Sequence, residues 1–193
     1  MVELTAERIR TKADEYDAVE PLAAVEDEHV EMLPGTFSGD EYGKRDVEWV
    51  VQWYYRRYLG SYSDRDRRER EGTFRENDFG EVIETLRVVD DLEDPAAKLR
   101  ELTTLSGVDV PIASAFLQFM SPDEYVVVGD REWAVLAAAG ELDGSYPDPP
   151  TIEEYLTYLA ACRRVTDRCG CGGWTLYKSI WRIWKTELAD RQP

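Results

Sequence analysis

The sequence of 193 residues contains one histidine, three cysteines and no hydrophobic run long enough to span a bilayer. Its first residues, MVELTAERIR, lack the basic and then apolar layout of a signal peptide. Three cysteines cannot all pair within one chain, so a disulfide framework is not expected. These features predict a cytoplasmic protein without a membrane segment.

Basic residues are scarce, and lysine is the scarcer kind. The chain has 40 acids against 23 bases, of which five are lysine, and its net charge is −17. The acids are scattered along the chain instead of forming a tail. This pattern is typical of a protein from a high-salt cytosol, where the Debye length shrinks to about 3 Å at 1 M salt and a hydrated acidic surface maintains solubility. The alternative is an acidic partner-binding protein in ordinary salt.

Apolar residues make up 43% of the chain and recur at helical spacing along most of it. We predict an all-α fold with no substantial sheet. Expected helix starts are capped by Asp46, Asn77 and Asp94, and a capping box begins at Thr151. The expected helices cover residues 5–17, 21–33, 47–59, 78–89, 95–105, 110–120, 130–140, 151–168 and 174–189, the last with buried Ile180, Trp181 and Trp184. Pro34 and Gly35 are expected to stop the second helix.

Two further segments allow two interpretations each. Residues 125–128 are β-branched and apolar, but no partner strand is found, so we interpret them as a buried connector. Residues 61–72, SYSDRDRREREG, form the most basic region of the chain together with Arg56 and Arg57. This region is either a phosphate-binding patch or a solvated segment in which Asp64, Asp66 and Glu69 pair with the arginines.

The stretch from residue 99 to 136 has the most distinctive pattern. A helix is followed by the turn Leu105-Ser106-Gly107-Val108-Asp109, an apolar helix, a short connector and a helix led by Asp130. This order resembles the helix-hairpin-helix DNA glycosylase superfamily, to which endonuclease III belongs, over about a fifth of the chain. The resemblance implies a hairpin at 105–111 that holds a DNA phosphate.

The resemblance also implies specific site residues. Gly107, Val108, Asp109 and Arg131 would bind double-stranded DNA, and Asp130 would be the catalytic acid that stabilises the sugar cation. An alignment without gaps from the hairpin places Gly129, one residue earlier, at the position of the catalytic Asp in some relatives. Capping of its own helix is the alternative role of Asp130.

Further departures bear on the chemistry. Asp109 replaces the second glycine of the usual Leu-Pro-Gly-Val-Gly turn and brings a carboxylate to the phosphate site. Val110 and Pro111 stand where bifunctional relatives carry the lysine for Schiff-base chemistry, so any activity is predicted to be that of a monofunctional DNA N-glycosylase.

The resemblance implies one compact unit, 1–193, with two helical lobes. Lobe one would comprise residues 1–44 and 130–193, and lobe two would comprise residues 45–129 with the hairpin.

The cysteines and the histidine are expected to play no part in catalysis. Some relatives hold an iron–sulfur cluster on four cysteines, but Cys162, Cys169 and Cys171 have different spacing and no fourth partner. We predict no metal and no cofactor. His29 is expected on the surface of an acidic helix.

Three functional hypotheses follow. The first is a glycosylase-like enzyme that flips a base into the cleft between the lobes. The second is a DNA-binding or protein-binding module with the same fold and no chemistry. The third is an acidic all-helical interaction or structural protein without a nucleic-acid role.

Overall fold

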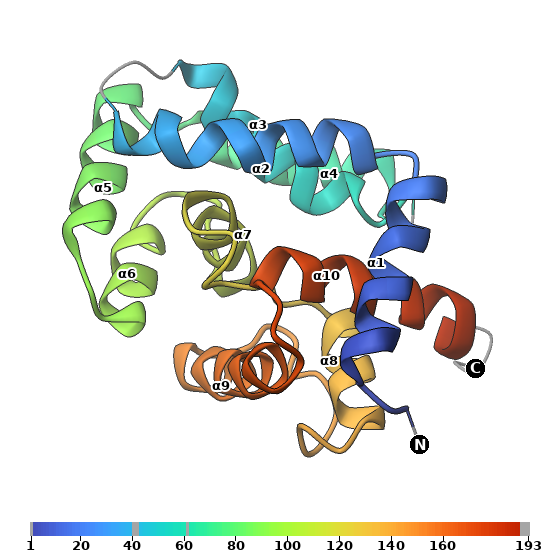
Figure 1. The fold of residues 1–193 in the computed structure, drawn as a ribbon. Helices are drawn as coiled ribbons and strands as arrows, with labels where there is room; N and C mark the ends of the chain where they lie inside the picture. Colours follow the sequence, from blue (N-terminus) through green and yellow to red (C-terminus); the bar gives the residue numbers. More distant parts are fainter. Residues whose placement is uncertain (1, 40–42, 61, 190–193) are drawn as a thin grey trace.

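The computed structural model describes residues 2–39, 43–60 and 62–189. These residues form ten α-helices and no strand, so the predicted all-α fold class is confirmed (Figure 1). The helices are α1 (Ala6–Val19), α2 (Ala23–Ser38), α3 (Lys44–Arg56), α4 (Asp64–Arg75), α5 (Phe79–Asp91), α6 (Pro95–Leu102), α7 (Val110–Met120), α8 (Asp130–Ala138), α9 (Ile152–Cys169) and α10 (Gly173–Ile183). One π-helical turn, Trp184–Leu188, follows α10.

Two of the predicted helix starts are confirmed in their chemistry. The Asp94 carboxylate accepts the backbone N–H groups of the first turn of α6. Thr151 and Glu154 form a reciprocal capping box at the start of α9. In both places a polar side chain satisfies amides that have no partner within the helix, so the local sequence is sufficient to fix the boundary.

Two other predicted caps are wrong by a few residues. Helix α3 begins after Gly43, and the Asp46 carboxylate accepts the Gly43 N–H at 2.8 Å from inside the first turn. Helix α5 is capped by Asp78 and not by Asn77. Asn77 is left free to bind other backbone groups, which matters for the hairpin described below.

The predicted stop at Pro34 is also wrong, because α2 continues to Ser38. Pro34 removes one intrahelical hydrogen bond, which ordinarily costs about 3 kcal/mol inside a helix. Leu33 and Phe37 lie one turn apart on the same face and are 0% and 2% exposed. Burying these two side chains against the core offsets the broken bond, so tertiary packing overrides the local signal.

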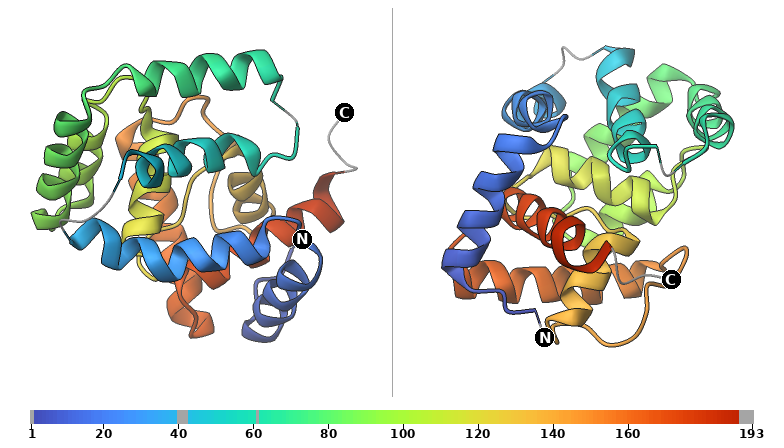
Figure 2. Two further views of the ribbon diagram at one scale, coloured as in Figure 1. Left: turned by 90° about the horizontal axis from the view of Figure 1, so that it is seen from above. Right: turned by 90° about the vertical axis from the view of Figure 1, so that its right-hand side faces the viewer.

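Helix α7 occupies the centre of the molecule. Every residue from Pro111 to Phe119 is buried, and α2, α3 and α6 pack against it (Figure 1). Helix α1 runs along α10, which in turn contacts α8 and α9; the two views of Figure 2 show α1 beside α10 at one side of the molecule. Because α2 contacts α5 and α7 as well as α1, one continuous core joins the helices.

The segment 125–128 is a buried connector and not a strand. Its backbone is satisfied by side chains: Gln118 accepts the N–H of Val127 at 2.8 Å, and Ser114 accepts the N–H of Val128 at 3.0 Å. The hydroxyl of Tyr158 donates to the carbonyl of Val127 at 2.8 Å. Such partners replace the ladder of a sheet, and they fix the approach of the chain to the start of α8.

The predicted last helix is divided. Helix α10 ends at Ile183, and a π-helical turn continues the chain. Ile180 and Trp181 are buried as predicted, but Trp184 is only half-buried. Trp184, the first residue of the π turn, packs against the edge of the core and lines the cavity described next.

Candidate functional site

The turn at Gly107 packs directly on the end of α4. Gly107 has φ +76°, and a Cβ atom added there would lie 2.9 Å from the backbone N of Phe74. Asn77 ties the two segments together, because its side chain accepts the Ser106 N–H at 2.8 Å and donates to the carbonyls of Phe74 and Ser106. Only glycine fits this position.

Asp109 caps the helix that follows the turn. Its carboxylate accepts the N–H of Ile112 at 3.0 Å, at the start of α7. Burial raises the pKa of Asp109 above its ordinary value, and the bond from Ile112 and the nearby Arg70 oppose this rise. The carboxylate that replaces the second glycine therefore occupies the anion-binding end of α7 itself.

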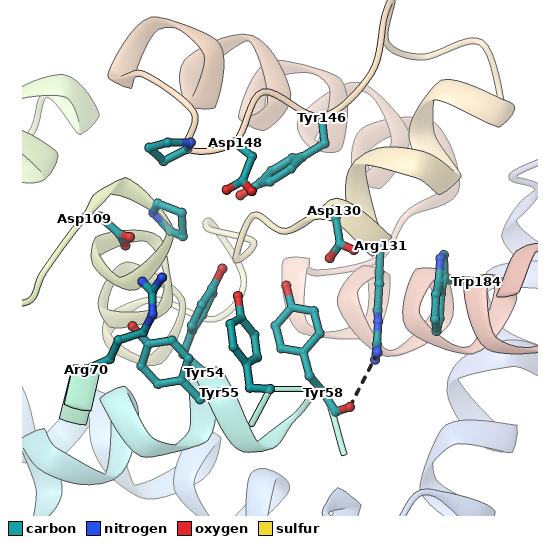
Figure 3. Close-up of a pocket in the computed structure, with 13 residues that line it drawn as sticks. Tyr54, Tyr55, Tyr58, Arg70, Asp109, Asp130, Arg131, Tyr146, Asp148 and Trp184 are labelled. Atoms are coloured by element: carbon teal, nitrogen blue, oxygen red, sulfur yellow. Dashed lines mark hydrogen bonds between the residues drawn. The ribbon is translucent and has the colours of Figure 1, made fainter. Parts of the chain in front are cut away.

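Asp130 does not cap α8. The N-cap is Gly129, which has no side chain to offer, and Asp130 is the first residue of the helix. No hydrogen bond from the amides of α8 to the Asp130 carboxylate is found among the described residues. Asp130 instead lines a cavity together with Tyr58 and Tyr62 (Figure 3).

Gly129 is the position at which the resemblance, aligned without gaps, would place a catalytic Asp. A Cβ atom at this position would lie within 2.6 Å of Tyr58 Oη, Arg57 Nη2 and Glu132 Oε2. These atoms fill the space that a side chain at 129 would need. Asp130 is therefore the acid that the start of α8 presents to the cavity.

A buried ion pair holds the start of α8 against α3. Arg57 Nη1 donates to Glu132 Oε1 at 2.6 Å, and the two side chains are 1% and 0% exposed. Burial disfavours the charged form of Arg57, but Glu132 and the neighbouring tyrosines together outweigh this effect, and the pKa of Arg57 is raised. The guanidinium also lies 4.5 Å from the ring centroid of Tyr58 and 4.8 Å from that of Tyr54. No local sequence pattern indicates this pair, because its members lie 75 residues apart.

The cavity has a volume of about 490 Å³ and lies between α3, α4, the starts of α7 and α8, the loop before α9 and the π turn. We call it the tyrosine cavity. It is lined by Tyr54, Tyr55, Tyr58, Tyr62, Arg70, Asp109, Pro111, Asp130, Arg131, Tyr146, Asp148, Pro149 and Trp184. The hydroxyl groups of Tyr54, on α3, and of Tyr58, just after α3, point into it, and Tyr55 lies beside Arg70 (Figure 3).

The phenols of the tyrosine cavity are neutral groups. Burial raises the pKa of Tyr55 to about 12 and raises the pKa values of Tyr54, Tyr58 and Tyr146 as well. The cavity therefore offers neutral hydroxyls and aromatic side chains beside the carboxyl groups of Asp109, Asp130 and Asp148. This combination suits a flat, partly polar ring system. The recurrence of tyrosine at 54, 55, 58 and 62, at the end of α3 and just after it, was the available signal for it.

A smaller hollow of about 350 Å³ lies next to the tyrosine cavity, on the hairpin. We call it the hairpin hollow. It is lined by Tyr55, Arg70, Thr73, Gly107, Val108 and Asp109. The structure thus brings the three predicted hairpin residues together at one concave surface and places Asp130 in the adjoining cavity.

Arg131, the fourth predicted DNA-binding residue, has a buried side chain. It is 7% exposed, and its guanidinium lies 4.1 Å from the Trp184 ring centroid and 4.5 Å from that of Trp181. Burial lowers the pKa of Arg131. Arg131 connects α8 to the last helix and forms one wall of the tyrosine cavity.

Residues 64–72 of the basic segment form most of α4. Arg67 pairs with Asp64 and with Glu71, and Arg68 lies 3.9 Å from Asp64. Within the described residues, Asp66 forms no such pair. The interleaved acids therefore neutralise part of this helix, with partners that differ in part from those expected.

Cysteine and histidine take no part in this site. Cys162 and Cys169 are buried, and the Cys169 thiol donates to the carbonyl of Leu4 at 3.4 Å. His29 is half-buried, because its ring stacks on Trp49 with centroids 3.6 Å apart, which differs from the surface position expected. Among the described residues, no three His, Cys, Asp or Glu side chains are grouped so that they could hold a metal ion.

Comparison of the chain with protein families, curated proteins and solved structures finds no match. Across the part of the chain that the structure describes, no helix combines the length and apolar character needed to cross a membrane.

Proposed function

We propose that the protein takes one extrahelical base of double-stranded DNA into the tyrosine cavity and cleaves its N-glycosidic bond with the help of Asp130. One observation carries this proposal: the Asp130 carboxyl group lines an aromatic cavity of about 490 Å³ that adjoins the Gly107 turn. Sites for small ligands commonly measure about 300–1,000 Å³. A nucleobase within the DNA stack cannot reach an enclosed acid, so the base must leave the duplex to react.

The residues present suit this chemistry. The side chains of Tyr54, Tyr58 and Trp184 line the space that the base would enter. When the bond between the sugar C1′ and the base nitrogen breaks, its electron pair leaves with the base and positive charge develops on the sugar. The Asp130 carboxylate stabilises that charge, a water oxygen then bonds to C1′, and the proton that this water loses ends on the departed base. Val110 and Pro111 provide no amine, so the reaction is hydrolytic.

The net charge of −17 opposes DNA binding at low salt. In molar salt the repulsion is screened over about 3 Å, and binding depends on shape and stacking more than on charge. We therefore place the activity in concentrated potassium chloride.

The test is the substitution Asp130→Asn. Because Asp130 does not cap α8, the amide should leave the free energy of unfolding nearly unchanged. Duplexes that each carry a damaged or mismatched base are incubated with protein in molar potassium chloride, and base loss is detected as alkali-labile strand cleavage. We expect the parent to excise at least one base and Asp130→Asn to be slower by about 100-fold or more.

Asp90→Asn, on the exposed side of α5, removes one carboxylate far from the cavity and serves as the matched control. It should excise at the parent rate. If the parent retains duplex DNA but excises no base from the panel, the protein is a binding module. If it neither excises nor retains DNA at any salt concentration, the proposal falls and the acidic interaction protein remains.

A further inference from the structure

The arginines of α4 divide into paired and unpaired groups. Arg67, Arg68 and Arg75 each lie within 4.0 Å of a carboxylate on α3 or α4. Arg65 and Arg70 are different, because no carboxylate of the described residues lies within that distance of their guanidinium groups. The hydrogen-bond neighbour of Arg70 is the neutral Tyr55 hydroxyl, and Asp109 lies near enough to interact with its charge, so Arg70 is held at the cavity without a direct ion pair.

Arg70 stands where the two concave surfaces meet. It lines both the tyrosine cavity and the hairpin hollow. Its guanidinium carbon lies 5.9 Å from the ring centroid of Tyr55. Figure 3 shows the guanidinium directed from α4 toward the cavity, on the side of Asp109. A ligand that fills the tyrosine cavity and extends over the hairpin must pass this group.

The hairpin itself has few donors left for an anion. The N–H of Ile112 at the start of α7 is bound by Asp109, and Pro111 has no N–H. The Asp109 carboxyl group also repels a negative ligand when it is ionised. An anion at the hairpin hollow therefore needs a cation from elsewhere in the fold, and Arg70 is the arginine that lines this hollow.

We propose that Arg70 binds a backbone phosphate of the DNA strand whose base enters the tyrosine cavity. This inference rests on the proposed function and adds the residue that positions the strand. The planar guanidinium donates two parallel N–H bonds to phosphate oxygens, which fixes the distance between that phosphate and Asp130. In this proposal the positive charge that binds the phosphate at the hairpin hollow comes from α4, which precedes the hairpin in the sequence.

The experiment measures binding and does not depend on excision. The probe is a fluorescein-labelled duplex with a central tetrahydrofuran abasic site, titrated with the full-length protein over a series of potassium chloride concentrations. Arg70→Gln should weaken binding about tenfold and reduce the slope of log affinity against log salt by about 1. The matched control is Arg65→Gln, which removes the same charge from an exposed position on α4 that lines neither surface.

A second series locates the phosphate. Single uncharged methylphosphonate linkages are placed at each position around the abasic site. One position should weaken binding by the parent and by Arg65→Gln, and have no further effect on Arg70→Gln. Arg70→Lys should restore part of the affinity, because it keeps the charge and loses the paired geometry.

The outcomes separate the two proposals. If the parent binds the duplex, and Arg70→Gln and Arg65→Gln lose the same amount of affinity, the role of Arg70 is refuted and the proposed function stands. The same conclusion follows if every methylphosphonate weakens Arg70→Gln by the same factor as the parent, because the two changes are then independent. If the parent binds and Arg70→Gln behaves as expected but Asp130→Asn has no effect on excision, only the catalytic role fails. A parent that binds no duplex overturns both.

Discussion

Replacing Gly107 by alanine adds one methyl group where the hairpin touches α4. The new Cβ atom would lie 2.9 Å from the backbone N of Phe74 and 3.3 Å from the carbonyl carbon of Thr73. These are backbone atoms inside a helix end, so they cannot swing aside as a side chain would. The substitution therefore combines conformational strain at φ +76° with a close contact.

Gly140 serves as a control that separates the loss of unfolding free energy into backbone strain and close contact. Gly140 has the same φ, +76°, but a Cβ atom there would meet nothing within 4 Å. Gly140→Ala should cost about 1–2 kcal/mol from the left-handed conformation alone. Gly107→Ala pays this cost and a further ~1–3 kcal/mol for the forced movement of packed backbone.

The assay is urea unfolding followed by circular dichroism, with thermal melting as a second measure. A loss of 1 kcal/mol lowers the melting temperature of a chain of this size by about 2–4 °C. Gly107→Ala should therefore melt several degrees below Gly140→Ala. If the two variants lose the same free energy of unfolding, Gly107 does not pack on α4, and the hairpin lacks the close contact on which the hollow depends.

Two further predictions concern buried charge. Arg57→Met and Glu132→Leu should each lower the free energy of unfolding by about 3–5 kcal/mol, because each leaves its buried partner unpaired. The double variant should lose less than the sum of the two. A double-mutant cycle in urea measures this difference, and additive losses would contradict the pairing. Burial raises the pKa of Glu26 above its ordinary value of 4.5, although bonds from Tyr16 and Trp53 oppose the rise. The folded protein therefore binds this proton more tightly than the unfolded chain, so its stabilising effect is present below pH 4.5 and is lost as pH rises through the folded pKa. Glu26→Gln removes that titration. As pH rises from 4.5 through the folded pKa of Glu26, the free energy of unfolding of the variant should therefore rise relative to that of the parent. Parallel pH profiles of the two proteins would refute the shift.

The sequence by itself determined the features that depend only on neighbouring residues. The caps at Asp94 and Thr151 depend on groups within four residues, and their patterns predicted them correctly. The turn pattern also predicted the glycine at 107, although its contact with α4 depends on the tertiary structure. The buried connector at 125–128 was predicted because the sequence contained no partner strand. Amphipathic spacing was enough to give the fold class, since each helix must bury one face.

Only the tertiary structure decided where α2 ends and what surrounds Asp130. Pro34 stays helical because Leu33 and Phe37 are buried by other helices, and no local pattern shows that compensation. Arg57 takes its partner from α8, and this pair excludes a side chain at position 129. Contacts between residues far apart in the chain depend on how the helices pack, so the carboxyl that lines the cavity is set by the fold and not by its place in a motif.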